Sequence, residues 1–291
     1  MWSMQQVTVF FIGLLPLPLL HLIAWPIGWL LYVTRNKQRH IAEVNLRLCF
    51  PHWPENRRQK LVRQSLVETS KTALETLKLW NSSKQKILGY IKKVKGSELL
   101  DNKGHGTILI APHLGNWEIV GFYCSSNVSM TNMYRQPKSP FLDKLMQKGR
   151  KKMGARLVPA TNQGVKLLLK ALHNNELIGL LPDQNPGKGT GVFVPFFNIQ
   201  TNTPILPVRL AQKTNATIVL AYAERLPWGR GYEIHFEEVN ESLYNENIEI
   251  AASAMNKELE DLITARPLQY WWGYSRFRQR PPGEEKLYIK D

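Results

Sequence analysis

The sequence predicts an α/β fold, in which a single domain with a mainly parallel sheet flanked by helices follows an N-terminal membrane helix. Two observations predict the domain: from about residue 106 onwards, short apolar runs typical of buried strands recur, and stretches with helical spacing separate them. A third observation, an apolar run over residues 7–33, predicts the membrane helix. The 291 residues, 43% of them hydrophobic, are enough for one large core.

The run over residues 7–33 contains no Asp, Glu, Lys or Arg. It is long enough to cross a bilayer, but its three prolines would bend it, and a bent run can also dip into one leaflet. A hairpin buried in a globular core is the alternative. Basic residues follow the run directly, so the positive-inside rule places the rest of the chain in the cytoplasm. These residues are Arg35, Lys37 and Arg39.

The segment between residues 39 and 89 is expected to be helical, with one helix beginning at Pro54-Glu55. One face of that helix is apolar and the other is basic, so it lies on a membrane surface or packs on the core with a solvated charged face. Over the whole chain, 38 Lys and Arg against 23 Asp and Glu give a net charge of +15. This surplus indicates an anionic partner, such as the lipids of the inner leaflet. No nucleic-acid-binding module is recognisable, so nucleic acid is not expected.

The elements of the expected sheet then follow in order. The strand-like runs are 107–112, 128–134, 155–159, 177–183, 216–222 and 232–239. The helix-like stretches between and after them are near 116–125, 141–153, 163–173, 203–213 and 248–265. Open α/β sheets bind ligands beyond the carboxyl ends of their strands, so polar residues where a run stops are candidate site residues. His113, Arg135 and Asp183 stand at such positions, and we expect them to converge.

The segment APHLGNWE, residues 111–118, carries the expected chemistry. His113 ends a strand and Glu118 lies in the first turns of the next helix, so that the carboxylate can reach back to Nδ1 of the imidazole. Such a pair fixes the tautomer and leaves Nε2 as a general base. A His at a strand end and a Glu at a helix N-terminus also occur for purely structural reasons. The spacing does not match HExxH, and no metal or cofactor is expected.

Together with three further blocks, this segment resembles the late acyltransferases of lipid A synthesis, the lauroyl/myristoyl type, within the wider glycerolipid acyltransferase superfamily. Their signature is a His, four residues, and then Asp or Glu, which APHLGNWE fits. The other blocks are MYRQPKSP (133–140), LLPDQNPGKGTGVFVPFF (180–197) and QYWWGYSRFRQRPPGE (269–284). The resemblance covers nearly the whole chain, with the blocks in the right order.

The resemblance implies transfer of a fatty acyl chain to a hydroxyl of a lipid A precursor, in lipopolysaccharide or lipooligosaccharide biosynthesis. The donor is a thioester of acyl carrier protein or coenzyme A. By this analogy His113 deprotonates the hydroxyl, and Glu118 orients the imidazole of His113. Arg135 or Arg150 is expected to contact an anion, either the oxyanion or a substrate phosphate. The alternative for Arg135 is an ion pair with Asp183, which is otherwise expected to orient a cleft residue or loop.

The resemblance also implies a bacterial inner-membrane protein, with residues 1–33 as the membrane anchor and 34–291 as a cytoplasmic acyltransferase domain. Residues 192–197 line an acyl tunnel or pack in the core. Basic residues between 144 and 152 dock an acidic carrier protein or lipid phosphates, or form a solvated helix face. Cys49 and Cys124 have no metal spacing, so reduced thiols are expected, with a single disulfide between them as the alternative. A non-catalytic lipid-binding protein, or an enzyme with a different acceptor such as glycerol phosphate, stays open.

Overall fold

A computed structural model of the chain describes residues 4–101, 104–187 and 189–289. Helices form its N-terminal third, as expected. They are α1 (Met4–Leu14), α2 (Leu17–Val33), α3 (Lys37–Cys49), α4 (Glu55–Asn81) and α5 (Lys84–Gly89). Helix α4 begins directly after Pro54, which confirms the predicted start. Proline is tolerated at this position because the first backbone N–H groups of a helix have no helical partner.

The core is a seven-stranded sheet with the order β1-β9-β8-β2-β5-β3-β4. Its strands are β1 (Ile91–Lys95), β2 (Thr107–Ile110), β3 (Met130–Tyr134), β4 (Arg156–Pro159), β5 (Leu177–Leu180), β8 (Thr217–Arg225) and β9 (Tyr232–Glu238). Strands β8 and β9 are antiparallel, and the other pairs are parallel. The expected α/β fold with a mainly parallel sheet is therefore confirmed.

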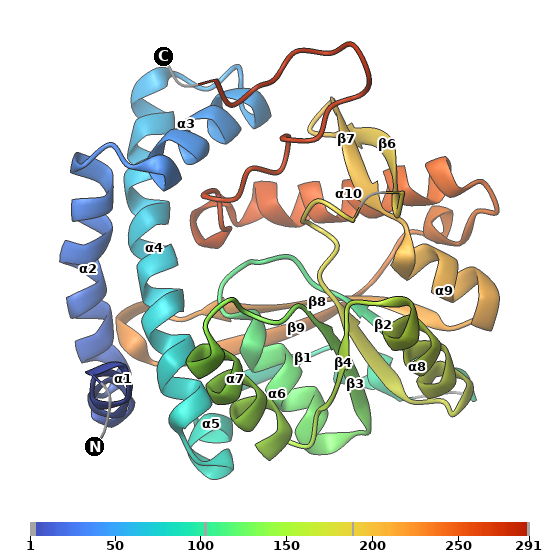
Figure 1. The fold of residues 1–291 in the computed structure, drawn as a ribbon, viewed down its shortest axis with the longest axis horizontal. Coiled ribbons are helices and arrows are strands. Elements are labelled where there is room, and N and C mark those ends of the chain that lie inside the picture. The colour runs from blue at the N-terminus through green and yellow to red at the C-terminus, as the bar shows by residue number, and fades with distance from the viewer. Residues whose placement is uncertain (1–3, 102–103, 188, 290–291) are drawn as a thin grey trace.

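Helices cover both faces of this sheet (Figure 1). They are α6 (Trp117–Asn127), α7 (Pro140–Lys152), α8 (Asn162–His173), α9 (Leu206–Thr214) and α10 (Ile248–Ala265). Side chains alternate along β2: Ile108 and Ile110 belong to the core shared with α8, α9 and α10, whereas Leu109 belongs to the core shared with α2 and α6. A separate antiparallel hairpin, β6 (Gly191–Phe196) and β7 (Ile199–Pro204), packs on α10.

The expectation of one membrane helix over residues 7–33 is corrected by the structure. The chain breaks between α1 and α2 because Pro16 is extended, with φ −69° and ψ 154°, just before the first turn of α2. Both helices lie against α4 (Figure 1). Within the described residues, no single helix is both long and apolar enough for a membrane span; α2 and α3 pass that test only as a pair bent by 79°.

One face of α2 is buried against α4, which partly matches the alternative of a core hairpin. Leu17, Leu20 and Ala24 are at most 2% exposed. At Gly28 the two backbones come so close that an added Cβ would lie 2.4 Å from the Cα of Val67. The outer face of α2 is different, because large apolar side chains there stay exposed.

Candidate functional site

Two loops meet beyond the carboxyl ends of β2 and β5, which are parallel neighbours in the sheet. The loop after β2 carries His113, and the loop after β5 carries Asp183. Oδ1 of Asp183 lies 2.8 Å from Nδ1 of His113, and Oδ2 accepts the backbone N–H of His113 at 2.9 Å. One carboxylate therefore fixes both the ring and the main chain of the histidine. Asp183, which was expected to orient a cleft residue, contacts His113.

The charge state of Asp183 determines which nitrogen of the imidazole is free. Burial raises the pKa of Asp183, which is 2% exposed, but His113 and its hydrogen bonds lower that pKa by more, so the net shift is downward. An ionised Asp183 accepts a hydrogen bond from Nδ1–H, so the proton of the neutral ring stays on Nδ1 and the lone pair is on Nε2. Nε2 lies 3.2 Å from the side-chain nitrogen of Gln184, a donor. The imidazole thus has the tautomer that a general base requires.

Two tryptophans border the imidazole. The ring centroids of Trp117 and Trp271 lie 4.6 Å and 5.6 Å from that of His113. The His113 carbonyl also accepts the backbone N–H of Trp271. Because indole rings exclude water, the histidine is only 15% exposed.

Glu118 does not make the contact that its spacing predicted, because Asp183 occupies Nδ1 of His113. Its carboxylate accepts hydrogen bonds from Trp80 Nε1 at 3.1 Å and from Arg150 Nε at 3.0 Å, and Arg150 Nη2 also contacts it. Burial raises the pKa of Glu118, but Arg150 and the hydrogen bond from Trp80 together with other nearby charge lower that pKa by more, so this carboxylate is also ionised. The expected Glu118–Nδ1 contact is therefore wrong, whereas a role of Glu118 in catalysis stays a prediction.

The two candidate arginines differ in their surroundings. Arg135 follows β3 and is exposed, and within the described ranges it makes no hydrogen bond or ion pair with another residue. The alternative ion pair with Asp183 is thus not formed. Arg150 lies in the last turn of α7, and its side chain is 20% exposed and bound to Glu118. Neither arginine contacts His113 directly, and their roles toward a substrate stay predictions.

A narrow cavity, partly open to solvent, lies beside the motif. Glu118 and Arg150 are its charged lining residues, and the rest of the lining is mainly apolar. The apolar lining comprises Leu109, Ala111, Trp117, Val120, Phe122, Met130, Met133, Ala155, Leu180 and Leu181. Residues 192–197 do not line it: most of them form β6, where Val194 and Phe196 are buried, as in the alternative of core packing.

The contacts of Gln184 and Trp80 and the presence of the cavity were not predicted from the sequence. Gly179 was an available signal, because a glycine inside an apolar strand indicates missing side-chain volume or a close approach. It lies in β5 and lines the cavity. Trp80 gave no comparable signal, since its place against Glu118 depends on how α4 packs.

The basic cluster on α7 is only partly available to a partner. Arg150 is bound to Glu118, and Lys152 Nζ contacts the carbonyl oxygens of Trp80 and Ser82. Lys144, Lys148 and Lys151 are exposed. Both cysteines, Cys49 and Cys124, are buried and unpaired, and burial raises the pKa of each thiol. In the part of the chain that the structure describes, no group of three or more His, Cys, Asp or Glu side chains is placed to hold a metal ion.

Comparison with known proteins identifies the family of the chain. The family model described as bacterial lipid A biosynthesis acyltransferase matches residues 1–279. The chain is 27% identical over 277 residues to the lipid A biosynthesis lauroyltransferase of Escherichia coli (strain K12), covering 94% of this chain and 90% of that one. It is 29% identical over 272 residues to a lipid A biosynthesis acyltransferase of Haemophilus influenzae, covering 92% and 86%. With the Escherichia coli lipid A biosynthesis myristoyltransferase the identity is 25% over 259 residues, covering 87% and 79%.

Proposed function

Because the chain belongs to the bacterial lipid A biosynthesis acyltransferase family, we propose that it moves a fatty acyl chain from a thioester donor to a hydroxyl of a lipid A precursor, with His113 as general base. The observation that carries the residue assignment is the ionised Asp183 on Nδ1 of His113, beside an apolar cavity. The donor is acyl carrier protein or coenzyme A. The acceptor is the hydroxyl of an acyl chain already present on the glycolipid.

The reaction needs one proton taken up and one returned. Nε2 of His113 removes the proton of the acceptor hydroxyl, and the oxygen attacks the thioester carbonyl carbon. The C–S bond then breaks, and the leaving thiolate takes the proton from the imidazolium. Asp183 stabilises this imidazolium, and general base catalysis of this kind contributes about 10²- to 10⁴-fold. Gln184, which now faces Nε2, gives way to the hydroxyl or binds it.

Glu118 acts through Arg150 in this proposal. The ion pair holds the guanidinium at the cavity wall, where it can donate to the oxyanion that forms on the thioester carbonyl. Arg135, exposed and unpaired in the described chain, is the candidate contact for an acceptor phosphate.

The cavity is the proposed site of the acyl chain. Its apolar lining from β2, β3, β5 and α6 suits a hydrocarbon, and Trp117, which contacts the ring of His113, is one of the lining residues. Exposed Lys144, Lys148 and Lys151 on α7 fit an acidic carrier protein that delivers the thioester.

We also propose that α1 and α2 rest in one leaflet of the inner membrane rather than cross it, with residues 34–291 on the cytoplasmic side. Their outer faces expose large apolar side chains, including Met4, Phe11, Leu14, Leu22, Trp25, Trp29 and Leu30. Helix α2 packs on α4 along its length, so a perpendicular α2 would draw charged parts of α4 into the hydrocarbon. A helix lying in the interface avoids this cost.

A second element beside α2 supports this orientation. Trp228, in the turn η2 (Pro227–Gly229), is 85% exposed and has a φ of +61°, which is unusual for a bulky residue. The turn contacts α2: a Cβ added to Gly229 would lie 2.5 Å from the backbone nitrogen of Pro18. The exposed indole and the neighbouring Arg230 match the side chains found at membrane interfaces. Trp228 is therefore proposed as a second membrane contact.

The membrane proposal is tested by flotation of the full-length protein with vesicles that contain anionic lipid. Trp228→Ala should bind several-fold more weakly than the wild type, because the indole loses its interfacial contact. Phe193→Ala is the matched control, since Phe193 is 37% exposed on β6, away from α1 and α2. Equal binding of Trp228→Ala and wild type would remove Trp228 from the membrane face.

The enzymatic proposal is tested with purified protein, a thioester donor and a lipid A precursor. Mass spectrometry should show the precursor gaining the mass of one acyl chain. His113→Ala should abolish this gain while circular dichroism and membrane association stay unchanged. If His113→Ala keeps more than about a tenth of the activity, His113 is not the base. Acylation of glycerol phosphate but not of the lipid A precursor would identify a different acceptor.

A further inference from the structure

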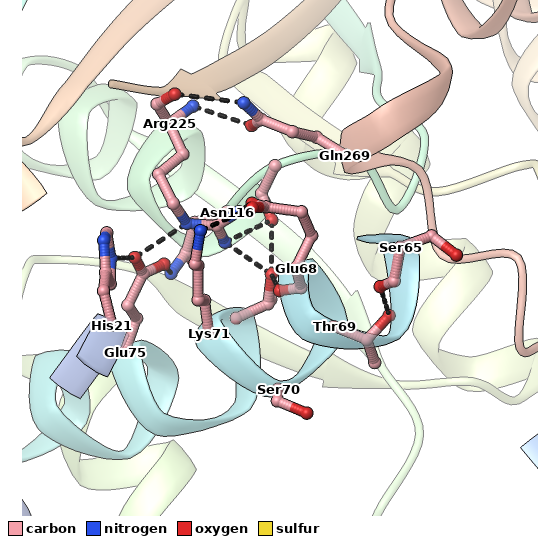
Figure 2. A network of polar contacts seen from close by, with 12 residues as sticks. His21, Ser65, Glu68, Thr69, Ser70, Lys71, Glu75, Asn116, Arg225 and Gln269 are labelled. Atoms are coloured by element: carbon pink, nitrogen blue, oxygen red, sulfur yellow. Dashed lines mark hydrogen bonds and ion pairs between the residues drawn. The ribbon is translucent and has the colours of Figure 1, made fainter. Parts of the chain in front are cut away.

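A buried network surrounds Arg225, the last residue of β8, which is 4% exposed (Figure 2). Its guanidinium contacts three side chains of α4: Nε lies 2.7 Å from Oε1 of Glu75, Nη1 lies 2.6 Å from Oε2 of Glu68, and Nη2 lies 2.5 Å from Oγ1 of Thr72. The side chain of Gln269 binds both the backbone N–H and the carbonyl of Arg225. The arginine is thus fixed at both ends.

This network holds the turn between the two motif residues. Thr72 Oγ1 and Arg225 Nη2 lie 2.9 Å and 3.3 Å from the carbonyl oxygen of Gly115. Asn116 donates its side-chain N–H to Oε2 of Glu75 at 3.1 Å. Gly115 and Asn116 are the central residues of the segment that begins with His113 and ends with Glu118.

The Gly115–Asn116 turn is also fixed by backbone contacts with Ala223 and Gln269. Gly115 has a φ of +59°, and an added Cβ would lie 2.0 Å from the carbonyl oxygen of Ala223. The backbone N–H groups of Gly115 and Asn116 are bound by the carbonyls of Gln269 and Ala223. Contacts from α4 and β8 together therefore set the path of the chain between His113 and Glu118.

The same network extends to the N-terminal helices. Nε2 of His21, on α2, lies 2.5 Å from Oε1 of Glu75, and the two side chains are 9% and 0% exposed. Burial raises the pKa of Glu75, but Arg225 and His21 lower it by more, to about 2. Glu75 is therefore a charged group that depends on partners from both β8 and α2.

We propose that Arg225, Glu75 and Thr72 are positioning residues for acyl transfer, which hold the Gly115–Asn116 turn so that His113 keeps its place against Asp183, and that His21 joins α2 to the same network. This inference rests on the proposed role of His113. Buried ion clusters are often no more stabilising than well-packed apolar side chains, so a charged cluster at this turn is better explained by a need for fixed geometry. The docked position of α2 then influences the reacting groups.

Thr72→Val gives a mild test, because it removes one hydroxyl and keeps the shape and charge of the site. The kcat for acyl transfer should fall about tenfold, since small displacements of reacting groups cost this much or more. The KM values for donor and acceptor should stay within about twofold, and the melting temperature should change little. Thr72→Ser, which restores the hydroxyl, should recover the kcat. Such rescue would not be expected if Thr72 only filled space.

Thr69→Val is the matched control. Thr69 lies on the same helix, but its hydroxyl donates to the carbonyl of Ser65 within α4 and does not contact the motif (Figure 2). Its kcat should equal that of the wild type within about twofold, although the same group has been removed.

His21→Leu tests the link to α2. It should lower kcat several-fold at unchanged KM while the protein still floats with vesicles, and His21→Gln, which can again donate to Glu75, should recover most of the loss. A His21→Leu protein with the kcat of the wild type would confine the network to α4 and β8 and overturn the link.

The outcomes separate this inference from the proposed function. Activity in His113→Ala would disprove the proposed base. If His113→Ala is inactive but Thr72→Val has a wild-type kcat, or changes only KM, the positioning role is wrong. It is also wrong if the whole loss in Thr72→Val is explained by a smaller folded fraction, measured by thermal unfolding of the same sample.

Discussion

Two carboxylates lie near the imidazole, and their surroundings give them different abilities. Asp183, in the loop after β5, is 2% exposed and binds His113. Glu118, in the first turn of α6, is 5% exposed and binds Arg150. Burial raises the pKa of each carboxyl, and the hydrogen bonds and charges around it together lower that pKa by more. The two groups are thus alike in burial and in charge.

The difference lies in their partners. Histidine gains and loses a proton near neutral pH, whereas arginine stays charged. Asp183 can therefore stabilise a charge that appears only during the reaction, and Glu118 holds a charge that is always present. A carboxylate close in sequence to a histidine is therefore not necessarily the partner of that histidine.

The largest expected effect is that of Asp183→Asn. The amide can still accept the backbone N–H of His113, but its NH2 group forces Nδ1 to accept and moves the proton to Nε2, the wrong tautomer for a base. We expect kcat to fall about 10²- to 10⁴-fold with little change in KM, measured by release of the donor thiol.

Glu176→Gln is the control for this substitution, because Glu176 pairs with Arg156, whose side chain is 62% exposed. Such surface pairs contribute little, so its kcat should match that of the wild type. A kcat for Asp183→Asn within about threefold of wild type would show that Asp183 does not orient His113 for the reaction.

A smaller loss, about tenfold in kcat, is expected for Glu118→Gln. The amide keeps a hydrogen bond to Arg150 but loses the charge that holds the guanidinium at the cavity. If Glu118 acts through Arg150, the double variant with Arg150→Met should lose no more than Arg150→Met alone. If the fold-loss of kcat in the double variant equals the product of the losses in the two single variants, Glu118 acts on the reaction independently of Arg150.

The sequence was sufficient to predict most of the sheet and the place of His113 at a strand end, because strand ends follow from local patterns of apolar residues. The partner of His113 was harder to predict. Asp183 reaches the histidine only because β5 lies beside β2, and strand order depends on packing between distant segments. Glu118 has the right spacing, but Trp80 of α4 and Arg150 of α7 bind its carboxylate.

Two other features of the structure, the β6–β7 hairpin and the burial of α2, were not predicted from the sequence, also for physical reasons. The β6–β7 hairpin was not predicted, because its turn places Phe197 and Asn198 at positive φ, and phenylalanine there gives no turn signal. At the N-terminus, the prolines were recognised as helix-bending, but the burial of one face of α2 was not. That burial includes His21, a residue that an apolar run alone gives no reason to single out.

The smallest expected effect concerns stability in acid, where substitution of either carboxylate, Asp183 or Glu118, should change the pH dependence of the unfolding free energy in the same way. A carboxylate with a pKa lowered by folding adds stability above its unfolded pKa, and this stability is lost as the pH falls through the folded pKa. Because folding lowers the pKa of both Asp183 and Glu118, Asp183→Asn and Glu118→Gln should each make the decline of unfolding free energy below about pH 4 shallower. Each change must stay below the limit of about 1.4 kcal/mol per pH unit for one proton. Urea unfolding at several acidic pH values measures the slopes. Similar slopes with very different kcat values would show that the two carboxylates are equivalent in the folded protein and unequal only in the reaction. If the slope of Asp183→Asn alone equals that of the wild type, folding does not lower the pKa of Asp183.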